Sequence, residues 1–428
     1  MKNILIAIRS IFKKGRHNVM KIVSLGIGLA VGLVLIAKVY FEQSYDDFYP
    51  DRDRVYQVWA KYQQNGGELK DYPQTSGGIA PTMQQQIPEI ETVTRYTSFG
   101  DWTFTMTDTK MKYSGRCIIA DSCFFDILPR PMLIGNAKEV LSTPMYVLIS
   151  SRIAKNIGGD VIGKNFTVDN SPGRTMTIGG VFEEVPENSH SRYDVIVSMA
   201  SAGRFMWEGS PTNMLGNDRY ISYVKLHKGV NPLALEEQVR TFVNSYFPPE
   251  EQQKVGLSID FSFHKLDNLH KELPQVKRMT WILSLLAFAL IFTAVMNYIL
   301  IVISSIVNRS KEVAVHKCYG ASENNIHGMM FGEALVHIVL SLILALLLIL
   351  AFRGTVEELL ATSLDSLLLS NGSLVLLGIC ILVFFVSGFM PGSLYARIPV
   401  VGFRWPPLSV ITGKISVSGR KPCCLSSL

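Results

Sequence analysis

Three groups of residues in this chain combine types and spacings that could do chemistry. The first is the segment from Gly158 to Lys164, GGDVIGK, which has the G-x4-G-K frame of loops that hold nucleotide phosphates with backbone N–H groups and a lysine. In such loops the next residue is Ser or Thr, whereas here Asn165 follows, and no buried strand stands immediately before the frame. We therefore reject a nucleotide site here and expect no ATPase activity from the chain itself.

The second group surrounds His190. Three glutamates lie close to it in sequence: Glu183, Glu184 and Glu187. These residue types could bind a metal ion, but their spacing matches none of the familiar ligand patterns. Ser189, His190 and Asp194 also supply the residue types of a hydrolase triad, yet nothing positions a nucleophile on a strained turn. We expect neither a metal site nor hydrolase chemistry.

The third group is the cysteines. Only five residues separate Cys117 from Cys123. A disulfide between them is one alternative if their compartment is oxidising, and two free thiols are the other, because neither belongs to a cysteine-rich framework. Cys318 and Cys380 are interpreted as small apolar residues without a reactive role.

The composition indicates what kind of framework must position these residues. The chain has 428 residues, of which 48 % are hydrophobic and 18 % charged, and its mean hydropathy is +0.24. It is too apolar for an ordinary soluble protein and too polar to lie entirely in a membrane. The net charge of +6 could suggest nucleic acid, but the basic residues cluster beside apolar runs, as they do at a cytoplasmic membrane face. We expect membrane spans, an aqueous domain and no nucleic-acid partner.

Four apolar runs are long enough, at about 20 residues or more, to cross a bilayer as helices. They are residues 19–40, 279–307, 328–352 and 373–396. Residues 1–18 precede them as a basic amphipathic helix, expected to lie on the cytoplasmic face and to place the amino terminus inside. No cleavage site follows the first run, so we interpret it as an uncleaved anchor. Lys38, near its end, is expected to extend its ammonium group to the membrane interface.

An aqueous domain is predicted between the first two spans, at residues 41–276, together with a short outside loop at 353–372. Strand patterns in the domain occur at 55–59, 103–107, 175–181, 195–199 and 220–226, and helical patterns at 80–86, 151–157 and 233–246. The order is mixed, without regular βαβ alternation, which favours an α+β fold. The predicted fold class is therefore an integral membrane α-helical protein with four transmembrane helices and a large α+β extracytoplasmic domain between helices 1 and 2.

Small and polar residues within the spans indicate how the helices could pack. Ser24, Gly28 and Gly32 lie four apart, a spacing that lets a second helix approach closely, although glycine is also simply frequent in membrane helices. The polar residues inside the spans are Asn297, Glu333 and His337. Ionisable groups are expensive there, so they are candidates for function, but a pairing with a neighbouring helix explains them as well. So few polar groups argue against a water-lined ion route.

The loop at 308–325 between the second and third spans carries basic residues, which the positive-inside rule places in the cytoplasm. They are Arg309, Lys311, His316 and Lys317. Val313 and Val315 alternate with these charges, so that a short helix could offer an apolar patch with a charged rim. Such a segment could bind a soluble partner or lie on lipid headgroups.

The run from Met296 to Ser322, MNYILIVISSIVNRSKEVAVHKCYGAS, closely resembles MacB/FtsX-type ABC transporter permeases. In that family this loop is the coupling helix, which sits in a groove of a separate cytoplasmic ATPase. The resemblance therefore favours docking, and the residues that match the family motif are Asn297, Arg309, Glu312, Val313, Lys317, Gly320 and Ala321. The residues expected to contact the ATPase are the motif residues between 309 and 321 together with Val315.

Five blocks of the aqueous domain also resemble the family's periplasmic core domain, in order and spacing as well as in wording. They are residues 44–58, 78–96, 120–141, 157–166 and 181–198. The resemblance implies a domain of two lobes with a discontinuous chain path, and it makes the Gly158 frame a turn into a strand. The usual family member is about twice as long and repeats the whole plan. This chain departs from that pattern after about Pro399, and its tail at 397–428, expected to be cytoplasmic, could be truncated or frameshifted.

The resemblance implies a permease subunit of the bacterial inner membrane, multi-pass with both termini cytoplasmic. A separate ATPase would bind ATP, the chain itself would need no cofactor, and movement of the coupling loop would reach the periplasmic domain by mechanotransmission, in export or efflux. Such a machine needs a second permease half, as a homodimer or heterodimer, and leaves room for a periplasmic partner. Two alternatives stay open: an FtsX-like regulator of a cell-wall hydrolase, and a non-functional truncated permease.

Overall fold

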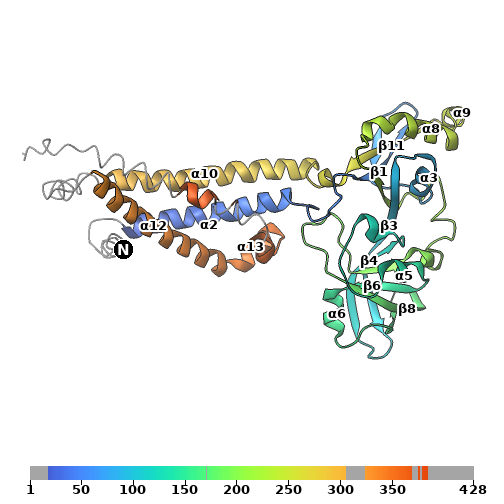
Figure 1. The fold of residues 1–428 in the computed structure, drawn as a ribbon, viewed down its shortest axis with the longest axis horizontal. Helices are drawn as coiled ribbons and strands as arrows, with labels where there is room; N and C mark the ends of the chain where they lie inside the picture. Colours follow the sequence, from blue (N-terminus) through green and yellow to red (C-terminus); the bar gives the residue numbers. More distant parts are fainter. Residues whose placement is uncertain (1–17, 170, 305–322, 369–374, 376–377, 384–428) are drawn as a thin grey trace, which may run out of the picture. The chain divides into compact units, whose positions relative to one another are not determined.

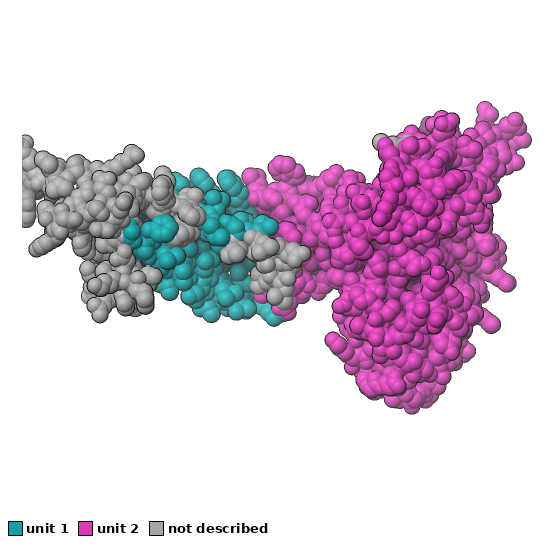
Figure 2. Space-filling view, viewed as in Figure 1, with its two compact units in different colours: residues 1–34, 286–356, 374–428 teal, residues 35–285, 357–373 magenta. Residues whose placement is uncertain are grey.

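The computed structural model describes residues 18–169, 171–304, 323–368, 375 and 378–383. These residues belong to two compact units (Figure 2). The first unit takes in Met1–Val34, Leu286–Val356 and Leu374–Leu428, and the second takes in Leu35–Leu285 and Glu357–Ser373. Nearly all of the predicted amphipathic helix, most of the coupling loop, most of the fourth span and the tail lie outside the described residues.

Three long apolar helices account for most of the described part of the first unit (Figure 1). They are α2 (Asn18–Gln43), α10 (Pro274–Ser304) and α12 (Glu323–Ala351). Within them, Asn18–Gln43, Pro274–Ile303 and Phe331–Ala351 are long and apolar enough to cross a membrane. These helices are rich in Leu, Ile and Ala, and proline occurs only at the first position of α10, where its missing N–H costs nothing. A fourth span remains a prediction.

The segment after α12, expected as a short loop, instead forms two short helices. They are α13 (Arg353–Leu360) and α14 (Leu364–Leu368). Glu357, Glu358 and two leucines are good helix formers, which explains α13. Ala361 ends it with a φ of 48°, in the left-handed region.

The second unit is built on one mixed sheet, whose strands follow the order β11-β1-β10-β3-β4-β9-β6-β8-β5, with β2 on β1 and β7 beside β3 and β8. The strands are β1 (Val55–Gln64), β2 (Lys70–Tyr72), β3 (Ile90–Met106), β4 (Lys112–Ala120), β5 (Met132–Ile134), β6 (Tyr146–Ser150), β7 (Asn165–Val168), β8 (Ser171–Phe182), β9 (Val195–Ser198), β10 (Ile221–Leu226) and β11 (Leu257–Lys265). The long strand β3 lies between β10 and β4 and forms a hairpin with β4. It therefore links the two halves of the sheet. Strands far apart in sequence, such as β1 and β11, become neighbours.

Short helices pack on this sheet. They are α3 (Ile79–Gln86), α4 (Phe124–Ile127), α5 (Ala137–Ser142), α6 (Ser151–Ile157), α7 (Ala202–Phe205), α8 (Glu236–Tyr246) and α9 (Pro249–Val255), with 3-10 turns at Met199–Ser201, Pro232–Leu235 and Leu266–Asn268. Figure 1 shows α3, α8 and α9 beside β1 and β11, and α5 and α6 beside β6 and β8. The predicted helices at 80–86 and 151–157 and the predicted strands are confirmed, and the helix expected at 233–246 opens as a 3-10 turn.

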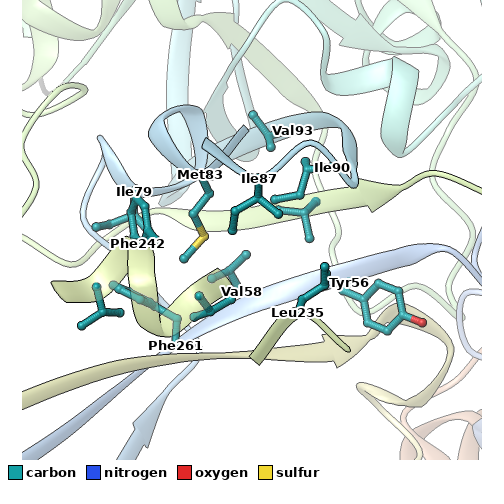
Figure 3. Packing of buried hydrophobic residues seen from close by; sticks show 14 of the residues in the cluster. Tyr56, Val58, Ile79, Met83, Ile87, Ile90, Val93, Leu235, Phe242 and Phe261 are labelled. Atoms are coloured by element: carbon teal, nitrogen blue, oxygen red, sulfur yellow. The ribbon is translucent and has the colours of Figure 1, made fainter. Parts of the chain in front are cut away.

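Each end of the sheet has its own hydrophobic core. Figure 3 shows one of them, to which alternate residues of β1, Tyr56 and Val58, contribute together with Met83 of α3 and Phe242 of α8. Every second side chain of a strand points to the same face of the sheet, and on this face those side chains pack against the apolar stripe of a helix. Burial of each such side chain stabilises the fold by about 1.5–3 kcal/mol. At the other end a second core gathers around Phe104, Phe166 and Ile149.

Candidate functional site at the C-terminal end of α2

The end of α2 is fixed by a buried aspartate. Asp46 lies three residues after the end of α2, is 0 % exposed and has a φ of 61°, a left-handed conformation that turns the chain and that Asp adopts more readily than most residues. Its N–H donates to the Asn188 carbonyl at 2.9 Å, and the Asn188 amide Nδ2 donates to the Ser44 carbonyl at 2.8 Å. The chain leaving α2 is therefore bonded at once to a loop about 140 residues further on.

The carboxylate of Asp46 binds the same loop. Oδ1 accepts hydrogen bonds from Ser189 Oγ and from the His190 backbone N–H, both at 3.2 Å, and Oδ2 lies 2.8 Å from His190 Nδ1. A buried carboxylate is expensive unless it is bonded in this way. We name the set of Ser44, Asp46, Asn188, Ser189 and His190 the α2 clamp.

The α2 clamp continues into the sheet. His190 Nε2 lies 2.5 Å from the hydroxyl of Tyr223 in β10, and Ser191 Oγ donates to the hydroxyl of Tyr96 in β3 at 2.8 Å. Burial raises the pKa of Tyr223 well above its ordinary value, so this hydroxyl, which any tyrosine keeps protonated at neutral pH, stays protonated further into the alkaline range. The clamp thus joins the end of a membrane-length helix to two strands of the sheet.

A second polar cluster lies one turn earlier on α2. Lys38 Nζ is 2.6 Å from Glu42 Oε1, and His270 Nε2 is 2.5 Å from Glu42 Oε2. Lys38 is only 7 % exposed, because its partner Glu42, four residues on, holds the ammonium group within the protein; its extension to the membrane interface stays a prediction. His270 stacks on Tyr45 at 3.4 Å between ring centres. Burial and then the Glu42 charge raise the pKa of Tyr45 to about 12.

The structure separates the residues around His190 that could have bound a metal ion. Glu183 pairs with Arg130 at 2.8 Å and Glu184 with Arg152 at 3.3 Å, while Glu187 bonds to Ser363. No group of three or more His, Cys, Asp or Glu side chains able to hold a metal ion occurs in the part of the chain that is described. The roles of these glutamates are therefore structural pairings.

The residue types of a hydrolase triad are likewise not assembled. Ser189 and His190 both turn to Asp46, whereas Asp194 pairs with Arg152 Nη2 at 2.6 Å. Sequence reasoning considered these residues but missed Asp46 as their partner. The pairing joins positions 144 residues apart, and only the topology brings them together.

The Gly158 frame is a turn between α6 and β7. Gly158, Gly159 and Gly163 have φ values of 74°, 66° and 77°, which only glycine adopts freely. Lys164 Nζ lies 4.0 Å from Asp108 Oδ2, and Asn165 begins β7. The frame therefore has a turn's geometry and leads into β7, which pairs with β3 and β8.

The two cysteines of the aqueous domain are free thiols. Cys117 is fully buried in the core around Phe104, and burial raises the pKa of its thiol. Cys123 donates from Sγ to the Val93 carbonyl at 3.1 Å. Of the two alternatives, the structure has the unbridged one.

The small residues of α2 face α10. A Cβ added at Gly28 would lie 2.2 Å from the Ala294 Cβ, and one added at Gly32 would lie 2.4 Å from the Ile291 Cγ1, distances that real side chains do not tolerate. Ser24 Oγ accepts a hydrogen bond from Asn297 Nδ2 at 2.6 Å. The backbones of the two helices therefore approach where side chains are absent.

Glu333 and His337 of α12 lie inside the helix bundle. Glu333 is 6 % and His337 is 2 % exposed, and His337 Nδ1 lies 3.5 Å from the Tyr298 hydroxyl of α10. Ser341 Oγ donates to the Ile22 carbonyl of α2 at 3.1 Å. Polar contacts between helices thus accompany the apolar packing.

The residues predicted for ATPase coupling lie outside the described residues. They are Arg309, Glu312, Val313, Val315, Lys317, Gly320 and Ala321.

Comparison with known proteins gives two family matches. Residues 20–242 match the family model of the MacB-like periplasmic core domain, and residues 284–400 match that of the FtsX-like permease C-terminal domain. No curated protein matches the sequence.

Two solved structures are similar to parts of the chain. A crystallised domain of a permease protein from Porphyromonas gingivalis shares 33 % identity, with a TM-score of 0.47, over 51 % of this chain and 91 % of that domain. The extracellular domain of the noncanonic ABC-type transporter YknZ from Gram-positive bacteria shares 11 % identity, with a TM-score of 0.34, over 49 % of this chain and 98 % of that one.

Proposed function

Because this chain belongs to the ABC transporter permeases of the MacB/FtsX type, we propose that it passes the stroke of a separate cytoplasmic ATPase to a domain on the other side of the membrane. The ATPase binds ATP, and the permease supplies the mechanical link. The chain acts with a second permease half, in export or efflux across the bacterial inner membrane, with both termini in the cytoplasm.

The single observation that carries this proposal is the α2 clamp. A flexible linker between a membrane helix and an outside domain would absorb movement, whereas here Asp46 is buried and bonded through backbone and side chain to residues 188–190. His190 passes the connection to Tyr223 of β10. A shift of the end of α2 therefore displaces the sheet with it, because packed and hydrogen-bonded elements transmit strain.

The helix α10 offers a parallel route. It begins at Pro274, shortly after His270, and the Glu42–His270 contact ties its approach to the end of α2. Within the first unit the two helices pack closely at Gly28 and Gly32. They can thus move as one pair rather than sliding past each other.

The cytoplasmic end of this route is the coupling loop. It follows α10 directly, and its family motif and basic residues favour docking to a soluble ATPase. Val313 and Val315 supply the apolar patch of the docking surface, and Arg309, Glu312 and Lys317 its charged rim. Few polar groups line the spans, which fits helices that relay force better than helices that conduct ions.

Copurification tests the docking. The detergent-extracted chain is isolated from its own cells, with and without Val313→Asp together with Val315→Asp. We expect an ABC ATPase to be retained by the native chain and lost from the double variant, because a charge in the apolar patch opposes burial.

The matched control is Val255→Asp. Val255 is 73 % exposed on α9 in the other unit, so the same chemical change there should leave retention unaltered. Retention of the ATPase by the loop variant, or its absence from both folded and membrane-inserted chains, contradicts the proposal.

A further inference from the structure

The helices α13 and α14 join the third predicted span to the fourth, yet most of this segment belongs to the second unit. Residues 357–373 group with Leu35–Leu285, whereas α12 groups with the first unit. The segment is therefore held to the base of the sheet domain by more than chain connectivity. Its contacts within that unit show what holds it.

The first contact is with Lys38. The Lys38 ammonium group donates to Thr362 Oγ1 at 2.7 Å while it also pairs with Glu42 at 2.6 Å. Thr362 is 6 % exposed. The ion pair of Lys38 and Glu42 on α2 is therefore hydrogen-bonded to the turn between α13 and α14.

The second contact is with Glu187, the residue before the α2 clamp member Asn188. Glu187 Oε2 accepts from the Ser363 backbone N–H at 3.1 Å and from Ser363 Oγ at 3.0 Å. A carboxylate that accepts two bonds from one residue fixes both its position and its orientation. Two adjacent residues of the turn are thus held by two different elements.

Burial follows the same pattern. Leu364 is 2 % and Leu367 is 1 % exposed, whereas Leu359, on α13, is 78 % exposed. Ala361 accepts the left-handed backbone that turns the chain inward. The side chains of Leu364 and Leu367 in α14 are therefore buried against the rest of the protein, whereas Leu359 of α13 is exposed.

We propose that residues 361–368 form a reversible strap that docks on Lys38 and Glu187 and fastens the link between the third and fourth spans to the sheet domain. Release of the strap leaves no buried charge unpaired, because Lys38 keeps Glu42 and the half-buried Glu187 can be hydrated. Docking makes the link follow the sheet domain, and only this consequence for transport rests on the proposed function.

Cysteine protection tests the strap without any ATPase, so its outcome is independent of the docking of the coupling loop. In the full-length chain with its native cysteines replaced by serine, Leu364→Cys is labelled in membranes with a water-soluble maleimide. Leu359→Cys is the matched exposed control. We expect Leu364→Cys to react about ten-fold or more slowly than Leu359→Cys, because labelling requires undocking.

Removal of the strap contacts should abolish much of this protection. Thr362→Val with Ser363→Ala changes only the strap, so the sheet domain keeps its fold, and Lys38→Met removes the partner from the other side. Each should raise the labelling rate of Leu364→Cys about ten-fold and leave that of Leu359→Cys unchanged. Equal rates for the two cysteines in the native background, or a Leu364→Cys rate that neither variant changes, overturns the proposal.

Discussion

Replacement of Asp46 tests the α2 clamp most sharply, because one residue combines a buried carboxylate with a left-handed backbone. Three substitutions separate these two contributions. Asp46→Asn keeps an oxygen acceptor, Asp46→Gly removes the side chain but suits a φ of 61°, and Asp46→Ala fails in both respects.

The magnitudes follow from the contacts. The carboxylate accepts two hydrogen bonds, from Ser189 Oγ and the His190 N–H, and each bond to a charged group stabilises by about 1.5–3 kcal/mol. Loss of both therefore costs about 3 kcal/mol or more, and a left-handed alanine adds about 1 kcal/mol. We expect losses of about 4 kcal/mol for Asp46→Ala, about 3 for Asp46→Gly and about 1 for Asp46→Asn, which still accepts both bonds.

Thermal unfolding of the purified chain in detergent measures this order. For a domain of this size, about 1 kcal/mol corresponds to roughly 2–4 °C, so Asp46→Ala should lower the Tm by about 10 °C and Asp46→Asn by only a few degrees. A Tm for Asp46→Ala within about 2 °C of the native chain would refute the reasoning. So would an equal loss for Asp46→Asn and Asp46→Ala, because the bonds would then not matter.

Three further predictions concern other parts of the molecule. Gly28→Ala should weaken the packing of α2 on α10 by about 1–3 kcal/mol, and Ala294→Gly in the same chain should restore much of the Tm, because the two Cβ positions compete for one space. Failure of the second change to rescue the first would contradict direct packing. Arg95 pairs with Asp121 at 3.2 Å and donates hydrogen bonds to the Gly77 and Pro211 carbonyls. Arg95→Met should therefore lower the free energy of unfolding by about 3 kcal/mol and speed proteolysis within residues 206–219. An unchanged cleavage rate would count against this role. Burial lowers the pKa of His264 below its ordinary 6.5, so the stability this residue contributes is present above pH 6.5 and is lost as the pH falls below it. His264→Phe, which keeps the stack on Trp59, should therefore show a smaller drop in Tm between pH 7.5 and pH 5.5 than the native chain; an equal drop argues against the linkage.

Local patterns in the sequence predict much of the secondary structure. The helix α6 agrees with its predicted bounds of 151–157, because its apolar spacing and its Ser150 cap are local signals. The strand β11 was not predicted, although Leu257, Ile259, Phe261 and Phe263 alternate with polar residues, which is a readable strand signal. Its partner β1 lies about 200 residues earlier, and no local pattern indicates that pairing.

The candidate site was predicted only in part. The four-residue spacing of Lys38 and Glu42 is the signal from which their ion pair could have been predicted. The pairing of Asp46 with Ser189 and His190 could not be read from the sequence, because it depends on the return of a distant loop to the end of α2. Buried polar contacts of this kind are set by tertiary structure, whereas membrane spans are set by composition.

The most direct test of the central claim is a distance measurement between the sheet domains of the two permease halves. One spin label is placed on the sheet domain of each half, at Leu133→Cys on β5 in this chain, which is 57 % exposed, and the ATPase is added to the purified permease. We predict that a non-hydrolysable ATP analogue shifts the distance distribution and that Val313→Asp with Val315→Asp abolishes the shift. An unchanged distribution while the ATPase binds the analogue, or a shift that persists in the loop variant, would contradict transmission of the ATPase stroke through this chain.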